Sequence, residues 1–171
     1  MILAIDPGNI ESGYVFTDDN LEVIECGKIN NYELIKKIGN FCWYNSSNKT
    51  NIAIEMVASY GMAVGATVFE TCVWIGRFKQ KIIECNYSED DIKLIYRKDE
   101  KMNICHTMKA KDSNIVQALI DRFAPNTPNK GKGTKKDPGW FYGFKKDIWQ
   151  AYAVAVTCSD MYFKEGEKSE N

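Results

Sequence analysis

The stretch Ile2-Leu3-Ala4-Ile5-Asp6-Pro7-Gly8-Asn9 decides the fold, because an apolar run ends abruptly in a carboxylate and a glycine turn. A run of this kind is typical of a buried strand whose last residue lies where the sheet opens to solvent. Residues 12–17 resume strand character after the turn, so the sequence predicts a hairpin with Asp6 at its mouth. Asp6 there either holds a cation or activates a water, or it is an Asx-type residue that caps the Pro-Gly bend.

A second apolar run, Asn51-Ile52-Ala53-Ile54-Glu55, also ends in an acid. Two neighbouring strands that feed one metal site would show this repetition, whereas the alternative is that Glu55 simply ends a strand in solvent. The loop that follows carries Tyr60 and Met62, which are candidates to stack on or wedge between nucleic-acid bases. Burial of Tyr60 against the next helix is the alternative.

The remaining elements follow from periodicity and turn residues. Residues 21–29 alternate and predict a third strand that completes an antiparallel meander, and Asn31 is the expected cap of a helix that reaches about residue 43. A long amphipathic helix is predicted over 65–85, with Phe69, Val73 and Trp74 off its apolar stripe and available for a dimer contact. A strand over 91–96, a charged loop over 97–101 and a helix from about residue 112 come next.

The closing helix, predicted over roughly 144–163, carries Asp147 and Gln150 three residues apart on one face. Ala151, Ala153 and Ala155 follow them. Because small residues let a helix lie close to a sheet, we expect this helix to bring Asp147 and Gln150 toward Asp6 and Glu55. Residues 164–171 are expected to form a frayed polar tail.

Composition bounds the class of protein. With 171 residues, of which 44% are hydrophobic, the chain has the size of one globular domain. It has neither an apolar window long enough for a membrane span nor the features of a signal peptide, so no membrane partner is expected. Six scattered cysteines are typical of reduced thiols in the cytoplasm, and the single histidine, His106, cannot build a catalytic triad.

Charge is distributed unevenly along the chain. The net charge is −1, yet residues 93–147 hold 13 Lys and Arg against 6 Asp and Glu. Such a segment favours a surface that faces phosphates, although charge runs are usually solvated faces. Lys109 and Lys111 open a helix, where lysines and free N–H groups can meet an anion together. Residues 125–143 are rich in Gly, Pro and Lys and are expected to form a mobile basic loop, with a solvated linker as the alternative.

The order of these parts resembles the RuvC family of Holliday junction resolvases, most closely its phage-type members, within the ribonuclease H-like superfamily. The resemblance rests on Ile5-Asp6-Pro7-Gly8, Glu55, the Lys-bearing helix start and the run from Lys146 to Ala153, and it spans Met1 to about Met161. It implies an α/β ribonuclease H-like fold, with a mixed five-stranded sheet flanked by helices, over residues 1–163.

The resemblance also implies an activity. Family members are homodimeric endonucleases that cut branched DNA at four-way junctions, here in the cytoplasm of a bacterial or phage-infected cell, with two Mg²⁺ per active site and Mn²⁺ as a substitute. Asp6, Glu55 and Asp147 match three of the four metal-binding acids, and Gln150 stands where the fourth is usually Asp. An amide oxygen can bind a metal but brings no charge, which puts the second metal site in doubt. Flaps or forks remain alternative substrates.

By the same resemblance, lysines near the helix start contact the scissile phosphate or its neighbours. Lys101, Lys109 and Lys111 are the candidates, and Lys111 is the one assigned a catalytic role. The basic loop has no counterpart in shorter members, and we assign its lysines to the DNA backbone: Lys130, Lys132, Lys135 and Lys136.

Two rival functions come from other classes. A branched-DNA-binding protein that does not cut is motivated by Gln150. An actin-like or sugar-kinase-like ATP-binding protein is motivated by the Asp6-x-Gly8 pattern. The second rival is disfavoured, because the chain is about half as long as a two-lobed fold of that kind requires and has no second Asp-x-Gly strand start at the expected distance.

Overall fold

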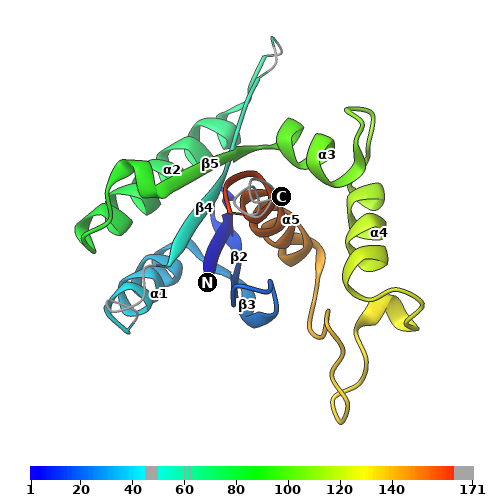
Figure 1. Cartoon of the computed structure of the whole chain (residues 1–171). Helices are drawn as coiled ribbons and strands as arrows, with labels where there is room; N and C mark the ends of the chain where they lie inside the picture. The colour runs from blue at the N-terminus through cyan, green and yellow to red at the C-terminus, as the bar shows by residue number, and fades with distance from the viewer. Residues whose placement is uncertain (45–49, 60, 62, 164–171) are drawn as a thin grey trace, which may run out of the picture.

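The computed structural model describes residues 1–44, 50–59, 61 and 63–163. Its centre is a mixed five-stranded sheet in the order β3-β2-β1-β4-β5 (Figure 1). Three strands form an antiparallel meander, and the other two run parallel to β1. Their bounds are β1 Ile2–Asp6, β2 Glu11–Thr17, β3 Val23–Asn30, β4 Asn51–Met56 and β5 Ile92–Tyr96. The predicted meander and mixed sheet are therefore confirmed.

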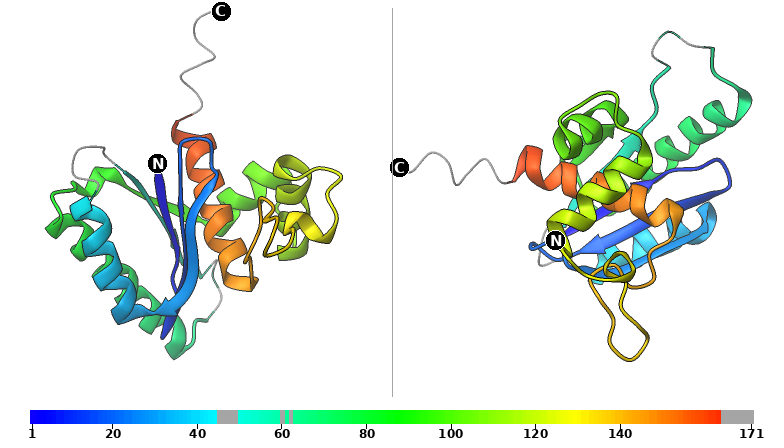
Figure 2. Two further views of the ribbon diagram at one scale, coloured as in Figure 1. Left: turned by 90° about the horizontal axis from the view of Figure 1, so that it is seen from below. Right: turned by 90° about the vertical axis from the view of Figure 1, so that its right-hand side faces the viewer.

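Helices cover both faces of the sheet. In Figure 2, α1 and α2 lie on one face, while α5 crosses the other face with α4 outside it. The bounds are α1 Asn31–Tyr44, α2 Ala66–Glu84, α3 Arg97–Cys105, α4 Asp112–Phe123 and α5 Lys146–Tyr162, with short 3₁₀ turns η1 Glu89–Asp91 and η2 Asn129–Gly131. Among the described residues, no helix is long and apolar enough to cross a membrane.

Strand alternation assigns each side chain of β1 to a face. Leu3 and Ile5 pack in the core under α1 and α2, whereas Ile2 and Ala4 pack in the core under α5. Because successive side chains of a strand point to opposite faces, Asp6 follows Ile2 and Ala4 onto the α5 side. The end of β1 therefore presents its carboxylate to the helix that closes the fold.

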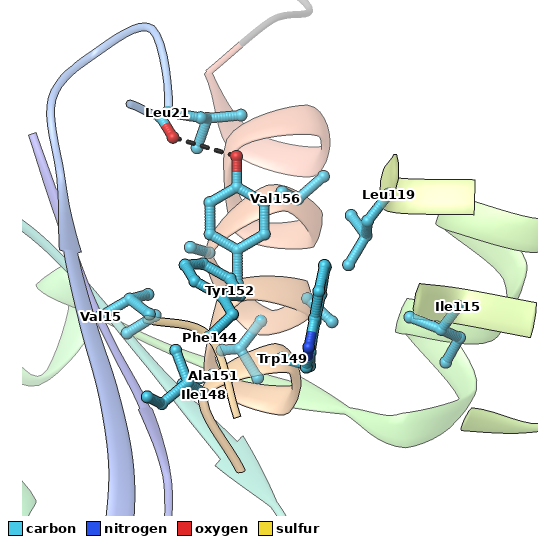
Figure 3. Close-up of a cluster of buried hydrophobic side chains, with 14 of the residues drawn as sticks. Val15, Leu21, Ile115, Leu119, Phe144, Ile148, Trp149, Ala151, Tyr152 and Val156 are labelled. Atoms are coloured by element: carbon cyan, nitrogen blue, oxygen red, sulfur yellow. Dashed lines mark hydrogen bonds between the residues drawn. The ribbon is translucent and has the colours of Figure 1, made fainter. Parts of the chain in front are cut away.

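Helix α5 is the central element of the core on the face of the sheet opposite α1 and α2. Every residue from Ala151 to Ser159 is buried, so the predicted close approach of a small-residue helix to the sheet is confirmed. Figure 3 shows Tyr152 donating a hydrogen bond of 3.0 Å to the carbonyl oxygen of Leu21. The same hydroxyl accepts a 2.9 Å hydrogen bond from the indole N–H of Trp140. Tyr152 thus ties α5 to the turn between β2 and β3 and to the segment that precedes the helix.

The segment 97–101, predicted as a charged loop, is instead the first half of α3. A carboxylate oxygen of Asp99 accepts the backbone N–H of Tyr96 at 3.0 Å, which stabilises the start of the helix. Ile104 and Cys105 pack against the core around α5, and Glu100 is fully buried. The composition of this segment is typical of a solvated loop. Burial against the rest of the protein nevertheless stabilises it as a helix.

Two smaller expectations were also wrong. Asn31 is buried within the first turn of α1, where its side chain bonds Gly8 and Ser12 across the β1–β2 turn rather than capping the helix. Asn30 accepts the Tyr32 backbone N–H in its place. Trp74 is buried between Tyr32 and Phe78 and is not available for a dimer contact.

The lysine-rich segment predicted as a mobile loop folds into a short hairpin over residues 128–139, which we call the basic hairpin. Its two sides pair at Gly133 and Pro138, and the backbone N–H of Gly139 donates to Lys132 at 3.0 Å. Gly131 is buried with φ of +69°, and a Cβ there would lie 2.5 Å from the Cβ of Ala124. Only glycine fits that position without strain, so close packing holds the base of the hairpin.

Candidate active site

Asp6 is the last residue of β1, and Glu55 is the second-last residue of the adjacent parallel strand β4. β1 and β4 pair from Ile2 with Asn51 to Ile5 with Ile54, so the next residue on each strand is an acid. Glu55 shares the face of Ala53, which packs under α5, and therefore points to the same side as Asp6. The two carboxyl groups share a hydrogen bond. Glu55 thus meets Asp6 rather than ending its strand in solvent.

The electrostatics of this pair are those of two acids in a poorly solvated place. Burial, and then the negative charge of Glu55, raise the pKa of Asp6 to about 9. Burial also raises the pKa of Glu55. The turn after Asp6 is closed by Ser12, whose hydroxyl accepts the Gly8 backbone N–H at 3.2 Å. Asp6 is therefore committed to the carboxyl pair and not to capping the bend.

Asp147 reaches this site through the close contact of α5 with β2. Gly13 lies opposite Asp6 in the β1–β2 register, and a Cβ on Gly13 would stand 2.5 Å from the carbonyl oxygen of Asp147. The first turn of α5 can therefore lie beside the end of β1 only because residue 13 has no side chain. The charge of Asp147 contributes to the raised pKa of Asp6. We call Asp6, Glu55 and Asp147 the carboxylate site.

Lys28 is a residue of the site that sequence reasoning missed. It pairs with Gly13 across the β2–β3 ladder, and its ammonium lies 2.8 Å from a carboxylate oxygen of Asp147 and 3.5 Å from one of Glu11. The hydrogen bond to Asp147 raises the pKa of Lys28. Alternation along the predicted strand could have placed Lys28 on this face only if the register of both hairpins had been known.

Gln150 lies one turn beyond Asp147 on α5. Its side-chain oxygen is buried and has no hydrogen-bond partner among the described residues. Because a buried polar atom without a partner is costly, this amide oxygen is suited to a ligand that supplies positive charge. The RuvC family usually has Asp at this position. Gln150 keeps a side-chain oxygen there but brings no negative charge.

The sequence analysis also misses Arg97 and Glu100 as residues of the site, because it predicts a charged loop over residues 97–101. Arg97 follows β5 directly and forms ion pairs with Glu100 on α3 and with Asp112 at the start of α4. Its positive charge lowers the pKa of both Asp6 and Glu55, against the larger effect of burial. The guanidinium of Arg97, just after the end of β5, therefore lies within electrostatic reach of Asp6 and Glu55.

The candidate DNA-binding residues lie in three places. Lys101 is partly buried on α3, and Lys109 and Lys111 are exposed where α3 gives way to α4, next to the Arg97–Asp112 ion pair. Lys130, Lys135 and Lys136 are exposed on the basic hairpin, with Lys132 partly buried. Tyr60 and Met62 lie outside the described residues, as does the 164–171 tail. Their proposed roles stay predictions.

The donor atoms at this site fit a hard divalent cation. All are oxygens, which Mg²⁺ and Mn²⁺ prefer, and the buried oxygen of Gln150 lacks a partner within the described ranges. Across the same residues, no three side chains of His, Cys, Asp or Glu form a ready-made metal-binding group. Instead Asp6 hydrogen-bonds Glu55, and Asp147 is paired with Lys28. Metal binding at this site would therefore require loss of the shared proton and movement of Lys28.

Comparisons with known proteins bear on the fold. No protein-family model and no curated protein sequence matches the chain. Among solved structures, the chain is similar to T. thermophilus RuvC in complex with a Holliday junction substrate, with a TM-score of 0.61 and 12% identity over 92% of this chain and 91% of that one. It is also similar to a second Thermus thermophilus RuvC structure, with a TM-score of 0.59 and 14% identity over 92% of each chain.

The likeness extends over nearly the whole length of this chain and of both RuvC chains. The expected architecture, a mixed five-stranded sheet flanked by helices, is thereby confirmed. At this identity the likeness is one of fold. The chain has the RuvC-like α/β fold of the ribonuclease H-like class.

Proposed function

We propose that this protein is a divalent-metal-dependent endonuclease that resolves four-way DNA junctions, in the manner of the phage-type RuvC enzymes that its sequence resembles. One observation carries the proposal. Three acids from distant segments, Asp6, Glu55 and Asp147, converge on one face at the open end of a RuvC-like sheet. Convergence of this kind is costly in a metal-free protein, because like charges in a buried place disfavour one another.

The residues divide the work of phosphodiester hydrolysis. Bound Mg²⁺, or Mn²⁺ in its place, would supply a water of lowered pKa and stabilise the leaving oxygen. Asp6 and Glu55 would release their shared proton and present carboxylate oxygens, while Asp147 and the amide oxygen of Gln150 would complete the set from α5. Lys111, at the start of α4, would contact the scissile phosphate.

The substrate of the proposed reaction is branched DNA in the cytoplasm of a bacterial or phage-infected cell. Lys101 and Lys109 would position the backbone beside the site, and the lysines of the basic hairpin would extend the contact. One of the solved structures to which the chain is similar is a RuvC in complex with a Holliday junction substrate, which supports this choice of partner.

A homodimer is part of the proposal, because paired cuts in a four-way junction require two sites. Phe69 and Val73 lie on one exposed face of α2 and are 61% and 62% exposed. Exposed apolar side chains at helical spacing favour a helix-to-helix contact. Replacing Phe69 with Glu should shift the protein from dimer to monomer in sedimentation measurements, and an unchanged sedimentation coefficient would exclude this face.

The function is tested by incubating the protein with a labelled synthetic four-way junction, a flap, a fork and a plain duplex, each with Mg²⁺ or Mn²⁺. We expect paired symmetric nicks in the junction that depend on the metal and disappear in Asp6→Asn. Asp121→Asn, a matched change at an exposed acid on α4, should cut like the wild type.

The rival that binds without cutting predicts a different result. Because Gln150 brings no charge, that protein would bind the junction tightly and leave it intact, and Gln150→Asp would restore cutting. Binding of ATP, with no preference for branched DNA, would instead support the ATP-binding alternative.

A further inference from the structure

Charged residues lie at or next to the ends of the three parallel strands of the sheet. β1 ends at Asp6, and β4 carries Glu55 next to its last residue. β5 pairs with β4 up to the contact of Met56 with Tyr96, and Arg97 is the residue that follows. Arg97 therefore begins α3 at the same edge of the sheet where the two carboxyl groups meet.

The guanidinium of Arg97 joins two acids from different helices. It is bound to Glu100, one turn along α3, and to Asp112, the first residue of α4. A planar guanidinium holds two carboxylates in fixed directions, which an ammonium cannot do. Arg97 thus ties the start of α4, beside Lys111, to the edge of the sheet.

Glu100 is the more unusual partner. Its side chain is 0% exposed, and one carboxyl oxygen meets Arg97 while the other has no hydrogen-bond partner within the part of the chain that the structure describes. Burial, and then the negative charge of Glu55, raise the pKa of Glu100 to about 9. A buried carboxyl group with an unpaired oxygen destabilises the folded protein. Its presence therefore favours a role in function.

The charges of Arg97, Glu100 and Asp112 indicate what Glu100 does. Arg97 has one positive charge and two carboxylate partners, so when ionised the three groups carry a net charge of −1. One negative charge is what Gln150 lacks relative to the acid that the resemblance expects there. Both Glu100 and Gln150 also hold a buried oxygen without a partner in the described ranges.

We propose that Arg97 and Glu100 are positioning residues of the carboxylate site, and that Glu100, when a bound cation offsets the repulsion that keeps it protonated, contributes the negative charge that Gln150 does not supply. Arg97 keeps Glu100 at the edge of the sheet where β4 and β5 end, within electrostatic reach of Glu55. This inference rests on the proposed metal-dependent function. It concerns how the site attracts a cation, which is measurable without any DNA.

The test measures Mn²⁺ binding to the metal-free protein by calorimetry and by the electron paramagnetic resonance of the ion. In Glu100→Gln the affinity of the weaker Mn²⁺ site should fall by about 10-fold or more, the range found when residues that support metal ligands are replaced. Arg97→Lys keeps the charge but loses the planar fork, and a loss of the same size is expected. Adding Gln150→Asp to Glu100→Gln should restore the affinity, because the charge is returned on α5.

Asp160→Asn is the matched control. Asp160 is the partly buried partner of Arg122, 2.6 Å away, and lies 13 residues after Asp147 on the same helix, or about 20 Å along its axis. It should leave Mn²⁺ binding unchanged. Circular dichroism and the melting temperature establish that each variant is folded, and Arg97→Lys with and without Gln150→Asp carries the test if Glu100→Gln does not fold.

Three results would overturn the inference. Mn²⁺ binding to folded Glu100→Gln that equals that of the wild type would do so, as would an equal loss in Asp160→Asn. Failure of Gln150→Asp to restore binding would show that Glu100 does not act through charge. A wild type that binds no Mn²⁺ would remove both the inference and the proposed chemistry, whereas Mn²⁺ binding without junction cleavage would remove the proposed function alone.

Discussion

The carboxylate site and the basic hairpin use charge in opposite ways. The acids come from three separate elements and are partly buried, and the charges of Glu55 and Asp147 help to raise the pKa of Asp6. Three of the hairpin's lysines are exposed, and all four belong to one continuous segment. Charges that are buried together depend on the whole fold, whereas exposed charges act nearly independently. Single changes should therefore matter greatly in the first region and little in the second.

The largest effect is expected at a strand-ending acid. Glu55→Gln keeps the shape of the side chain and removes its charge from the carboxylate site. We expect junction cleavage to fall by about 1000-fold, equivalent to about 4 kcal/mol of transition-state stabilisation. Single-turnover cleavage at saturating protein measures this directly. A loss of less than about tenfold would show that Glu55 does not contribute to the chemical step.

A smaller but still large effect is expected from Gly13→Ala, which changes no charge. The added methyl group would lie 2.5 Å from the carbonyl oxygen of Asp147, so the first turn of α5 must move away from β1. We expect about 100-fold slower cleavage, in line with a displacement of about 1 Å, together with about 1–3 kcal/mol of lost stability.

Gly76→Ala is the control for that change. Gly76 is exposed within α2, and a Cβ there meets no atom within 4 Å. Alanine should stabilise the helix by up to about 1 kcal/mol and leave cleavage unchanged. If both glycine variants cut equally well, Gly13 does not set the position of Asp147.

The basic hairpin should respond only when several lysines are changed together. Replacing Lys130, Lys132, Lys135 and Lys136 with Ala should reduce the slope of log affinity against log salt by up to about 4, or about 1 for each lysine that contacts a phosphate. Each single replacement should weaken junction binding by only a few-fold. Fluorescence anisotropy at several salt concentrations measures the slope, and an unchanged slope in the fourfold variant would remove this segment from the DNA interface.

A prediction of a different kind concerns stability and pH in the metal-free protein. The pKa of Asp6 is raised from 3.8 to about 9, so the folded state disfavours the ionised form that the unfolded chain adopts freely above its ordinary pKa. The stability that this group contributes is complete below that ordinary pKa and is lost as pH rises toward 9. The melting temperature should therefore fall between about pH 5 and about pH 8, by about 2–4 °C for each kcal/mol lost.

Asp6→Asn provides the comparison for this measurement. The amide cannot ionise, so the variant should lose less stability over the same pH range than the wild type does. Glu55 and Glu100, whose pKa values are also raised by burial, account for the part of the decrease that remains. Parallel curves for the two proteins would mean that Asp6 ionises as freely in the folded protein as in the unfolded chain.

Much of the site was predictable because it depends on short-range patterns. An acid at the end of an apolar strand is visible in the sequence at Asp6 and again at Glu55. The small residues after Gln150 indicated a helix pressed on the sheet, and α5 is buried as that pattern predicts. Strand alternation and helix packing are local rules, and both were obeyed here.

The rest depended on contacts that no local pattern contains. Lys28 reaches Asp147 through the register of two successive hairpins. The segment from Arg97 looked solvated because it is densely charged, yet burial of Glu100 places it in a helix. The basic hairpin looked irregular because of its glycines and lysines, although the buried side chain of Phe141 and the tight fit at Gly131 hold its base.

The position of α5 also governs when the proposed activity can appear during synthesis. β1 leaves the ribosome more than a hundred residues before Asp147 does, and the central strands have no cover on one face until α5 docks there. Contacts so distant in the sequence cost more loop-closure entropy than local contacts do. A nascent chain that stops before residue 146 therefore holds two of the three acids and none of the helix that completes them, so the carboxylate site cannot be complete until α5 has been made.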